Sequence, residues 1–140
     1  MPTVITKRLN EVTDRIIAGA VQVHRAIGPG LLESAYTACL LFELRRMNLK
    51  VRTKQAVPVV YEDVRLDCGY QLDMLVEDLV VVELKAVAQL AAIHEAQMIT
   101  YLKLTGYPAG LLMNFNVKLL RNGVRRILNP KPSPQFLAAD

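Results

Sequence analysis

Apolar residues at helical spacing fill the first third of the chain. In residues 9–27, LNEVTDRIIAGAVQVHRAI, they recur every three or four positions, which predicts an amphipathic helix. The GPG sequence at 28–30 ends this helix and begins a second one, which we expect from Leu31 to about Asn48. Two packed helices therefore open the predicted fold.

Alternating and continuous apolar runs predict strands in the rest of the chain. In chain order the predicted elements are strands at 56–62, 64–76 and 79–87, a helix at 89–105, and strands at 109–115 and 124–129. Pro58 favours an edge position or an irregular start for the first strand. The order of helix, helix, three strands, helix and two strands predicts an α/β sandwich with a mixed sheet.

The composition fits one compact domain. A chain of 140 residues with 52% apolar residues can bury one core, and it is not typical of a disordered protein. We expect a single domain over residues 1–130 and an irregular tail over 131–140. No apolar run approaches the roughly 20 residues that cross a bilayer, so no membrane association is expected. Charges in the first 15 residues argue against a secretory peptide and favour the cytoplasm.

The two cysteines do not suggest a disulfide scaffold or a zinc site. Neither Cys39 nor Cys68 has a His or Cys at zinc-finger spacing. We expect both to be buried as small apolar residues in a reducing compartment.

Basic residues are unevenly spread, although the net charge is only +4. Every acidic residue except Asp140 lies at or before Glu95. One basic cluster comprises Arg45, Arg46, Lys50, Arg52 and Lys54, and the other comprises Lys103, Lys118, Arg121, Arg125, Arg126 and Lys131. Such clusters form either a solvated face or a surface that contacts phosphates, and the sequence leaves both readings open. The absence of Trp and the few aromatic residues argue against base stacking as the main contact.

The apolar run VVVELKAV at 80–87 contains two charges, Glu83 and Lys85. A buried charge costs several kcal/mol unless it is paired or binds an ion. In a strand both side chains point to the same face. A two-residue turn before this strand pairs Asp73 with Val82 and leaves Asp73 and Glu83 on opposite faces. A three-residue connection over 77–79, or a bulge, pairs Asp73 with Glu83 instead.

With a three-residue connection or a bulge, the carboxylates of Asp73 and Glu83 and the ammonium group of Lys85 converge. Oxygen ligands of this kind suit Mg²⁺ or Mn²⁺, and the backbone carbonyl of Leu84 is a further candidate ligand. Lys85 would then orient or deprotonate a water, or stabilise negative charge on a phosphoryl oxygen. The alternative is a simple ion pair between Glu83 and Lys85.

A second acid lies in GLLESAY, where Gly30, Glu33 and Tyr36 are spaced i, i+3, i+6. Glu33 and Tyr36 are therefore neighbours on one helix face. Glu33 also occupies the first turn, where the helix dipole favours an acid whether or not it has a chemical role.

A polar stripe follows the charged strand in HEAQMITYL. His94, Gln97 and Tyr101 at i, i+3, i+7 share one side of a helix and would face the same site. The alternative reading makes His94 and Gln97 surface residues and Tyr101 a core residue.

Taken together, these segments resemble a known family. The sequences GPGLLESAY, YQLDMLVEDLVVVELKAV, HEAQMITYLKLTG and GLLMNFN, within residues 10–128, closely resemble small bacterial proteins named GxxExxY proteins. These proteins are grouped with the PD-(D/E)xK nuclease superfamily. The resemblance implies an α/β, restriction-endonuclease-like core, with a mixed four- to five-stranded sheet flanked by helices.

The resemblance also implies roles for individual residues. Asp73 and Glu83 match the two metal-binding acids, Lys85 matches the catalytic lysine, and Glu33 matches the helix-borne acid that completes the metal shell. All four are therefore candidate catalytic residues, and the three acids with the Leu84 carbonyl are the candidate metal ligands.

The candidate substrate-binding residues lie on two helices. Gln97 and Tyr101 form a Q-x-x-x-Y pattern like that of RecB-type exonuclease domains, and Tyr36 and His94 are added as further candidates. Leu72 precedes Asp73 where the superfamily pattern has proline, but that position is variable in the superfamily.

The implied function is a Mg²⁺-dependent (or Mn²⁺-dependent) nuclease acting on DNA in preference to RNA. Because the core is small and no extra DNA-binding domain is evident, a homodimer is expected. The alternative is a catalytically silent nuclease-fold module that binds nucleic acid or a protein partner, since a fold does not establish an activity.

Overall fold

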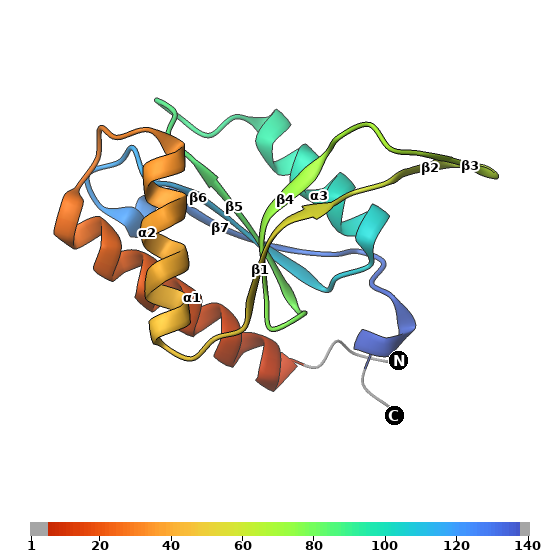
Figure 1. The fold of residues 1–140 in the computed structure, drawn as a ribbon, viewed down its shortest axis with the longest axis horizontal. Helices are drawn as coiled ribbons and strands as arrows, with labels where there is room; N and C mark the ends of the chain where they lie inside the picture. Colours follow the sequence, from red (N-terminus) through yellow and green to blue (C-terminus); the bar gives the residue numbers. More distant parts are fainter. Residues whose placement is uncertain (1–5, 138–140) are drawn as a thin grey trace.

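The computed structural model describes residues 6–137 as a five-stranded mixed sheet between two helical layers (Figure 1). The strand order is β1-β4-β5-β6-β7, and all neighbours are antiparallel except β5 and β6, which are parallel. This arrangement confirms the predicted mixed sheet of four to five strands flanked by helices.

The helices and strands follow one another in an order close to the predicted one. They are α1 (Thr6–Ile27), α2 (Glu33–Arg46), β1 (Val51–Ala56), β2 (Val59–Tyr61), β3 (Val64–Leu66), β4 (Gln71–Val76), β5 (Val80–Lys85), α3 (Ala92–Thr105), β6 (Ala109–Asn114), η1 (Leu120–Gly123), β7 (Val124–Leu128) and η2 (Pro134–Phe136). No helix among residues 6–137 is both long and apolar enough to cross a membrane.

One face of the sheet is covered by α1 and α2. The apolar stripe of α1, which includes Val12, Ile16 and Ala20, is fully buried at helical spacing. It forms one core with α2 and with the sheet residues that point to this side, such as Val82 and Leu84.

The opposite face is covered by α3. Met98 and Leu102 pack there against sheet residues such as Leu75, Val81 and Leu112. Because α3 links β5 to its parallel neighbour β6, it is the crossover that a parallel pair requires. The catalytic candidates on β4 and β5 therefore lie in a sheet that is buried on both sides.

The structure divides two of the predicted strands. Residues 56–62 and 64–76 each contain a break, and the short strands β2 and β3 form a separate ribbon that projects from the body (Figure 1). Pro58 lies between β1 and β2, where the chain leaves the main sheet. The prediction missed β1 because its sequence, VRTKQA, is largely polar. An edge strand tolerates such residues, since one of its sides has no strand neighbour.

One local prediction is wrong. Cys39 and Cys68 are exposed, not buried: Cys39 lies on α2 and Cys68 follows β3. The predicted irregular tail contains the short helix η2, whose Phe136 is buried against Tyr107 with ring centroids 5.9 Å apart. The last three residues of that tail, 138–140, lie outside the described part of the chain.

The connection between β4 and β5 has three residues. Val76 pairs with Val80, so Glu77, Asp78 and Leu79 make the turn. This confirms the odd connection that the sequence analysis required. Glu77 and Asp78 both adopt left-handed backbone, with φ of 54° and 53°. Each such residue other than glycine carries a cost of about 1–2 kcal/mol.

Polar contacts hold this turn in its left-handed conformation. The Glu77 carboxylate accepts hydrogen bonds of 2.6 Å from Arg8 Nη2 and from the backbone N–H of Lys50. Asp78 lies 2.9 Å from Lys50 Nζ and 3.4 Å from Arg52 Nε. The two acids of the turn are therefore anchored to α1 and to the start of β1.

Replacing Glu77 tests this balance of strain and anchoring. We expect Glu77→Ala to lower the free energy of unfolding by about 1–3 kcal/mol, because the side chain no longer accepts two hydrogen bonds. Glu77→Gly removes the same bonds but relieves the left-handed strain, so it should be about 1 kcal/mol more stable than Glu77→Ala. Urea denaturation of both variants measures the difference, and equal stabilities would contradict the strain.

Candidate active site

The strands β4 and β5 separate at the candidate site formed by Asp73 and Glu83. The ladder between β4 and β5 ends at the pair Met74–Val82, and beyond it the strands spread apart (Figure 1). The same register places Asp73 opposite Glu83. The backbone N–H of Asp73 donates to Glu83 Oε1 at 3.3 Å, and the N–H of Leu84 donates to Asp73 Oδ2 at 3.0 Å. The two carboxylates thus take up backbone donors at the point where the strands part.

Glu83 is a buried acid beside a second acid. Its exposed fraction is 7%. Burial, followed by the negative charge of Asp73 and a hydrogen bond with its carboxyl group, raises the pKa of Glu83 to about 9, and nearby Lys85 offsets this only in part. At neutral pH Glu83 therefore holds a proton unless another cation takes its place. An all-oxygen donor set with this repulsion fits Mg²⁺ or Mn²⁺.

Lys85 and Glu33 bring further charge to this point. Lys85 ends β5, half-buried, and Glu33 begins α2. Burial raises the pKa of Glu33, the positive charge of Lys85 opposes that rise, and the negative charge of Asp73 adds to it. The start of α2 and the ends of two strands therefore share one electrostatic environment.

The predicted set of three metal-binding acids is only partly assembled. Among residues 6–137, no group of three or more His, Cys, Asp or Glu side chains lies close enough to hold a metal ion. Asp73 and Glu83 meet directly, whereas Glu33 is within range of the charges of Lys85 and Asp73 without joining the cluster. Leu84 contributes an N–H bonded to Asp73, and its side chain lies in the α1–α2 core.

Tyr36 does not contact substrate, contrary to the prediction. Its exposed fraction is 0%, its hydroxyl donates to the carbonyl of Gly28 at 2.7 Å, and it accepts from the N–H of Leu31 at 3.1 Å. Its ring stacks on Phe115 with centroids 4.7 Å apart. A side chain without exposed surface cannot bind substrate, so Tyr36 instead anchors the loop between α1 and α2.

The spacing of Gly30, Glu33 and Tyr36 now has a structural reason. Gly30 has φ of 105°, which favours glycine. Tyr36 fixes the loop that contains Gly30, and the loop sets where α2 begins. Glu33 is the first residue of that helix. Gly30 thus allows the chain to turn, Tyr36 holds the turn, and Glu33 places an acid at the start of α2.

Tyr101 faces the site from the other helical layer. Burial raises the pKa of Tyr101, and the charges of Glu83, Tyr70 and Asp73 raise it further. The rings of Tyr70 and Tyr101 are 6.1 Å apart. Gln97, exposed and one turn earlier on α3, lies on the same side of the helix.

His94 has a structural contact that the sequence analysis did not foresee. Its Nδ1 accepts the backbone N–H of Ala91 at 2.9 Å, at the start of α3. The ring therefore caps a free backbone donor of the helix. Only the other ring nitrogen remains for substrate.

Asn114 was not predicted as a site residue. It is 1% exposed, pairs with Lys85 across β5 and β6, and binds the backbone of Val87 in both directions, at 3.1 and 2.9 Å. These bonds fix the chain just after Lys85. The available signal was a lone amide at the end of the buried apolar run AGLLMN, because such a polar group must find partners.

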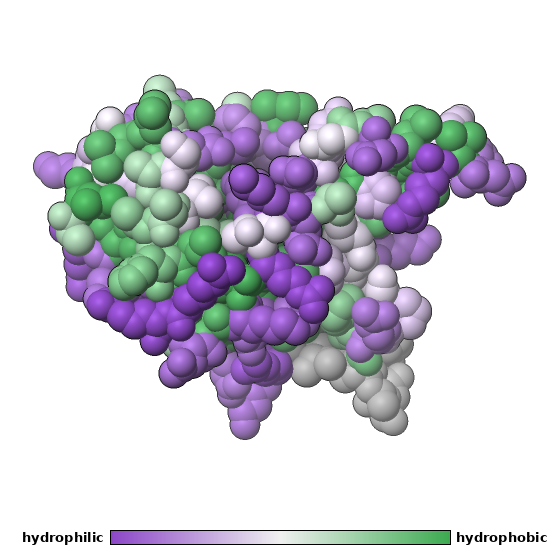
Figure 2. Space-filling model, viewed as in Figure 1, coloured by the Kyte–Doolittle hydropathy of each residue, from purple (hydrophilic) through white to green (hydrophobic). Residues whose placement is uncertain are grey.

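A groove of about 690 Å³ leads to Asp73 between α2, β1 and β4. Glu33, Thr37 and Lys54 are among its lining residues. Hydrophilic surface covers this part of the molecule in Figure 2, between apolar areas over α1–α2 and over the β2–β3 ribbon. Two of the candidate acids, Glu33 and Asp73, therefore line a groove at the surface.

Most of the first basic cluster is paired with acids. Arg46 lies 2.6 Å from Glu43, and Lys50 and Arg52 both pair with Asp78. These pairs support a structural reading of the 45–54 region. Lys54 differs, because it lines the groove beside Asp73.

The chain was compared with known protein families, curated proteins and solved structures. A family model described as the PD-(D/E)XK nuclease superfamily matches residues 10–127. The matched range includes the strands that carry Asp73, Glu83 and Lys85 and the helices that carry Glu33 and Tyr101. No curated protein and no solved structure matches the chain.

The raised pKa of Glu83 predicts a pH dependence of stability. An acid whose folded pKa of about 9 exceeds its ordinary value of 4.5 stabilises the fold fully below pH 4.5, and this contribution disappears as the pH rises through 9. The metal-free protein should therefore lose several kilocalories per mole of stability between about pH 5 and 9 from this residue.

Urea denaturation with a chelator at several pH values measures this loss. Glu83→Gln, which stays neutral, should flatten the profile, and Glu11→Gln, at an exposed acid on α1, should not. A wild-type profile as flat as that of Glu83→Gln would contradict the prediction.

Proposed function

The chain belongs to the PD-(D/E)XK nuclease superfamily, and we propose that it is a metal-dependent phosphodiesterase that hydrolyses DNA. The observation that carries the proposal is the meeting of Asp73 and Glu83 where β4 and β5 part, with Lys85 at the end of the same strand. Within the superfamily we place the chain among the GxxExxY proteins, because Gly30, Glu33 and Tyr36 each have a defined part in one loop and helix. DNA is preferred over RNA as substrate, and a homodimer is the proposed working unit.

Asp73 and Glu83 are the proposed metal ligands, with Glu33 and the Leu84 carbonyl completing the set. Mg²⁺ or Mn²⁺ is the proposed ion, since the donors are all oxygen atoms. A bound divalent ion supplies positive charge to a phosphoryl oxygen and lowers the pKa of a bound water.

The remaining residues act on water and on the substrate. Lys85 donates from Nζ to the attacking water or to a phosphoryl oxygen, where an ammonium group stabilises developing negative charge. Tyr101 and Gln97 position the strand from α3, and Lys54 contacts a phosphate in the groove. Asn114 is a positioning residue, because it fixes the backbone after Lys85.

The intact charge set favours turnover over a silent binding module. A module that only binds has no need to hold two repelling carboxylates together beside a lysine. A lone ion pair between Glu83 and Lys85 also fails to explain the geometry, because Asp73 is the direct partner of Glu83.

Cleavage assays test the assignment. In Mg²⁺ or Mn²⁺ we expect the wild type to cut DNA, and Lys85→Ala and Asp73→Asn to lose at least about 100-fold in rate, because each removes a group at the reacting phosphate. Lys103→Ala, at an exposed lysine on α3, is the matched control. The variants must keep their circular-dichroism spectra. Wild-type rates in both site variants would reject the proposal.

Thermal unfolding tests the metal site without relying on activity. Mg²⁺ binds the folded chain only, so at 100 times Kd it should stabilise the wild type by about 2.7 kcal/mol and raise Tm. Asp73→Asn should remove this rise, whereas Glu11→Gln should retain it. Equal shifts in wild type and Asp73→Asn would place the ion elsewhere.

A further inference from the structure

A second cavity lies at the first residues of the α1–α2 loop, Gly28 and Pro29. It has a volume of about 560 Å³ and is bounded by the end of α1, the start of the loop, and the segment around η1. Its lining residues are Val21, His24, Arg25, Gly28, Pro29, Lys118, Leu119, Leu120 and Arg121. Four of these carry basic groups and none carries an acid. We call this cavity the α1–η1 pocket.

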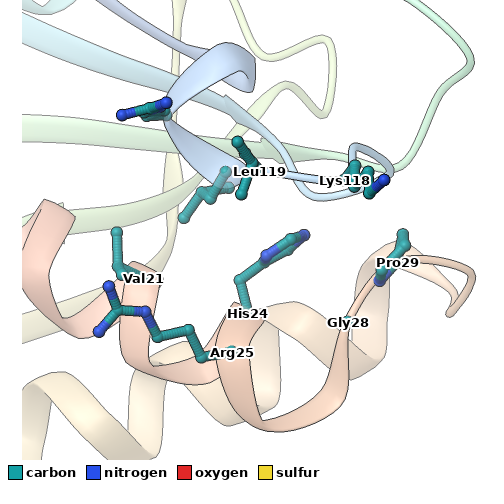
Figure 3. Close-up of a pocket in the computed structure, with 9 residues that line it drawn as sticks. Val21, His24, Arg25, Gly28, Pro29, Lys118 and Leu119 are labelled. Carbon is teal, nitrogen blue, oxygen red and sulfur yellow. The ribbon is translucent and has the colours of Figure 1, made fainter.

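Cationic side chains reach the α1–η1 pocket from two separate walls. Figure 3 shows Arg25 on α1 and Lys118 on the facing segment, with the pocket between them. Arg121, on η1, is part of the second wall. The negative end of the α1 dipole accounts for a basic residue in its last turn, such as Arg25, but not for Lys118 and Arg121.

The cations of the α1–η1 pocket differ in their pairing from several other basic residues of the chain. Arg46, Lys50, Arg52 and Arg125 all lie within 4.0 Å of a carboxylate. Within residues 6–137, Arg25, Lys118 and Arg121 have no ion pair and no side-chain hydrogen bond. Three like charges around one concavity repel one another, and an anionic ligand relieves that repulsion.

The pocket is connected to the catalytic strand through backbone contacts. The carbonyl of Lys85 accepts the N–H of Phe115 at 2.9 Å. His24 Nε2 donates in turn to the carbonyls of Phe115 and Val117, at 3.2 and 2.8 Å. Because both acceptors are carbonyl oxygens, Nε2 carries the proton. These bonds tie α1 to the segment that presents Lys118. Figure 3 shows the His24 side chain pointing away from α1.

We propose that the α1–η1 pocket binds a backbone phosphate of the nucleic-acid strand whose cleavage site lies at Asp73 and Glu83. The inference rests on the proposed function and adds a second phosphate contact to the one proposed for Lys54 in the groove. Arg25, Lys118 and Arg121 neutralise the phosphate, and Val21, Leu119 and Leu120 provide an apolar wall for the uncharged part of the nucleotide. His24 is a positioning residue. Gly28 and Pro29 line the pocket, and Glu33, four residues after Pro29, lines the groove at Asp73, so one strand following this short segment reaches both.

Binding measurements separate this pocket from the chemistry. A labelled oligonucleotide is titrated by fluorescence anisotropy, with a chelator present and in the Lys85→Ala background, at about 50 to 200 mM salt. The test variant carries Lys118→Glu and Arg121→Glu, and the control carries Lys7→Glu and Lys131→Glu. Lys85→Ala lowers the net charge from +4 to +3, and each Glu replacement removes two more charge units, so both double variants reach −1. A milder pair, Lys118→Gln with Arg121→Gln, serves if the first does not fold.

We expect the pocket variant to bind at least about 10-fold more weakly and the control to change less than about 2-fold. The slope of log K against log salt should fall by about 0.7 to 0.9 for each phosphate that the variant no longer neutralises. Equal losses of affinity in both variants would mean that only net charge matters, and this would overturn the proposal. An unchanged affinity of the pocket variant would overturn it too.

Two further outcomes also overturn it. One is a wild type that binds no oligonucleotide. The other is that inorganic phosphate binds at the pocket but leaves oligonucleotide binding unaffected, which would mean that the pocket binds a free anion. The nuclease assignment fails on a different readout, the cleavage rate of Lys85→Ala, so the two failures are distinguishable.

Discussion

The number of residues between β4 and β5 is the constraint on which the site depends. Side chains alternate across a sheet, so a three-residue turn places Asp73 and Glu83 on the same side, and a two-residue turn would separate them. The turn holds two non-glycine residues in left-handed backbone. Contacts of its two acids with α1 and β1 offset that cost. The strained turn and its ion pairs, at the closed end of the β4–β5 hairpin, thus determine which side chains meet at its open end.

At the open end of the β4–β5 hairpin, side-chain carboxylates replace the backbone hydrogen bonds between the strands. The carboxylates of Asp73 and Glu83 accept the backbone N–H groups where the ladder has ended. This arrangement gives the backbone N–H groups hydrogen-bond acceptors but leaves two acids in contact. The pKa of Glu83 is therefore raised to about 9, and Glu83 holds a proton at neutral pH. The shared proton removes the repulsion between the two acids, and in the proposed function a metal cation takes over that role. Asn114 keeps the chain ordered just beyond it.

Two groups can be distinguished among the basic residues. Those that meet acids, such as Lys50 and Arg52 at the turn, support the fold. Those that face a concavity, such as Lys54 in the groove and Lys118 at the α1–η1 pocket, are available to an anion. Both groups look alike in the sequence, because a cluster of Lys and Arg does not reveal which acids will fold against it.

The sequence by itself determined the three helices, the apolar strands β5 and β6, and the candidates Asp73, Glu83 and Lys85, because periodicity and charges in an apolar run are local signals. Only the tertiary structure decided that β1 joins the sheet, that Cys39 is exposed, and that Tyr36 is a buried anchor. It also decided that Glu33 stays apart from the acid pair and that His94 caps α3. Burial and hydrogen-bond partners arise from segments far apart in the chain, and spacing along one helix or strand carries no information about what packs against it.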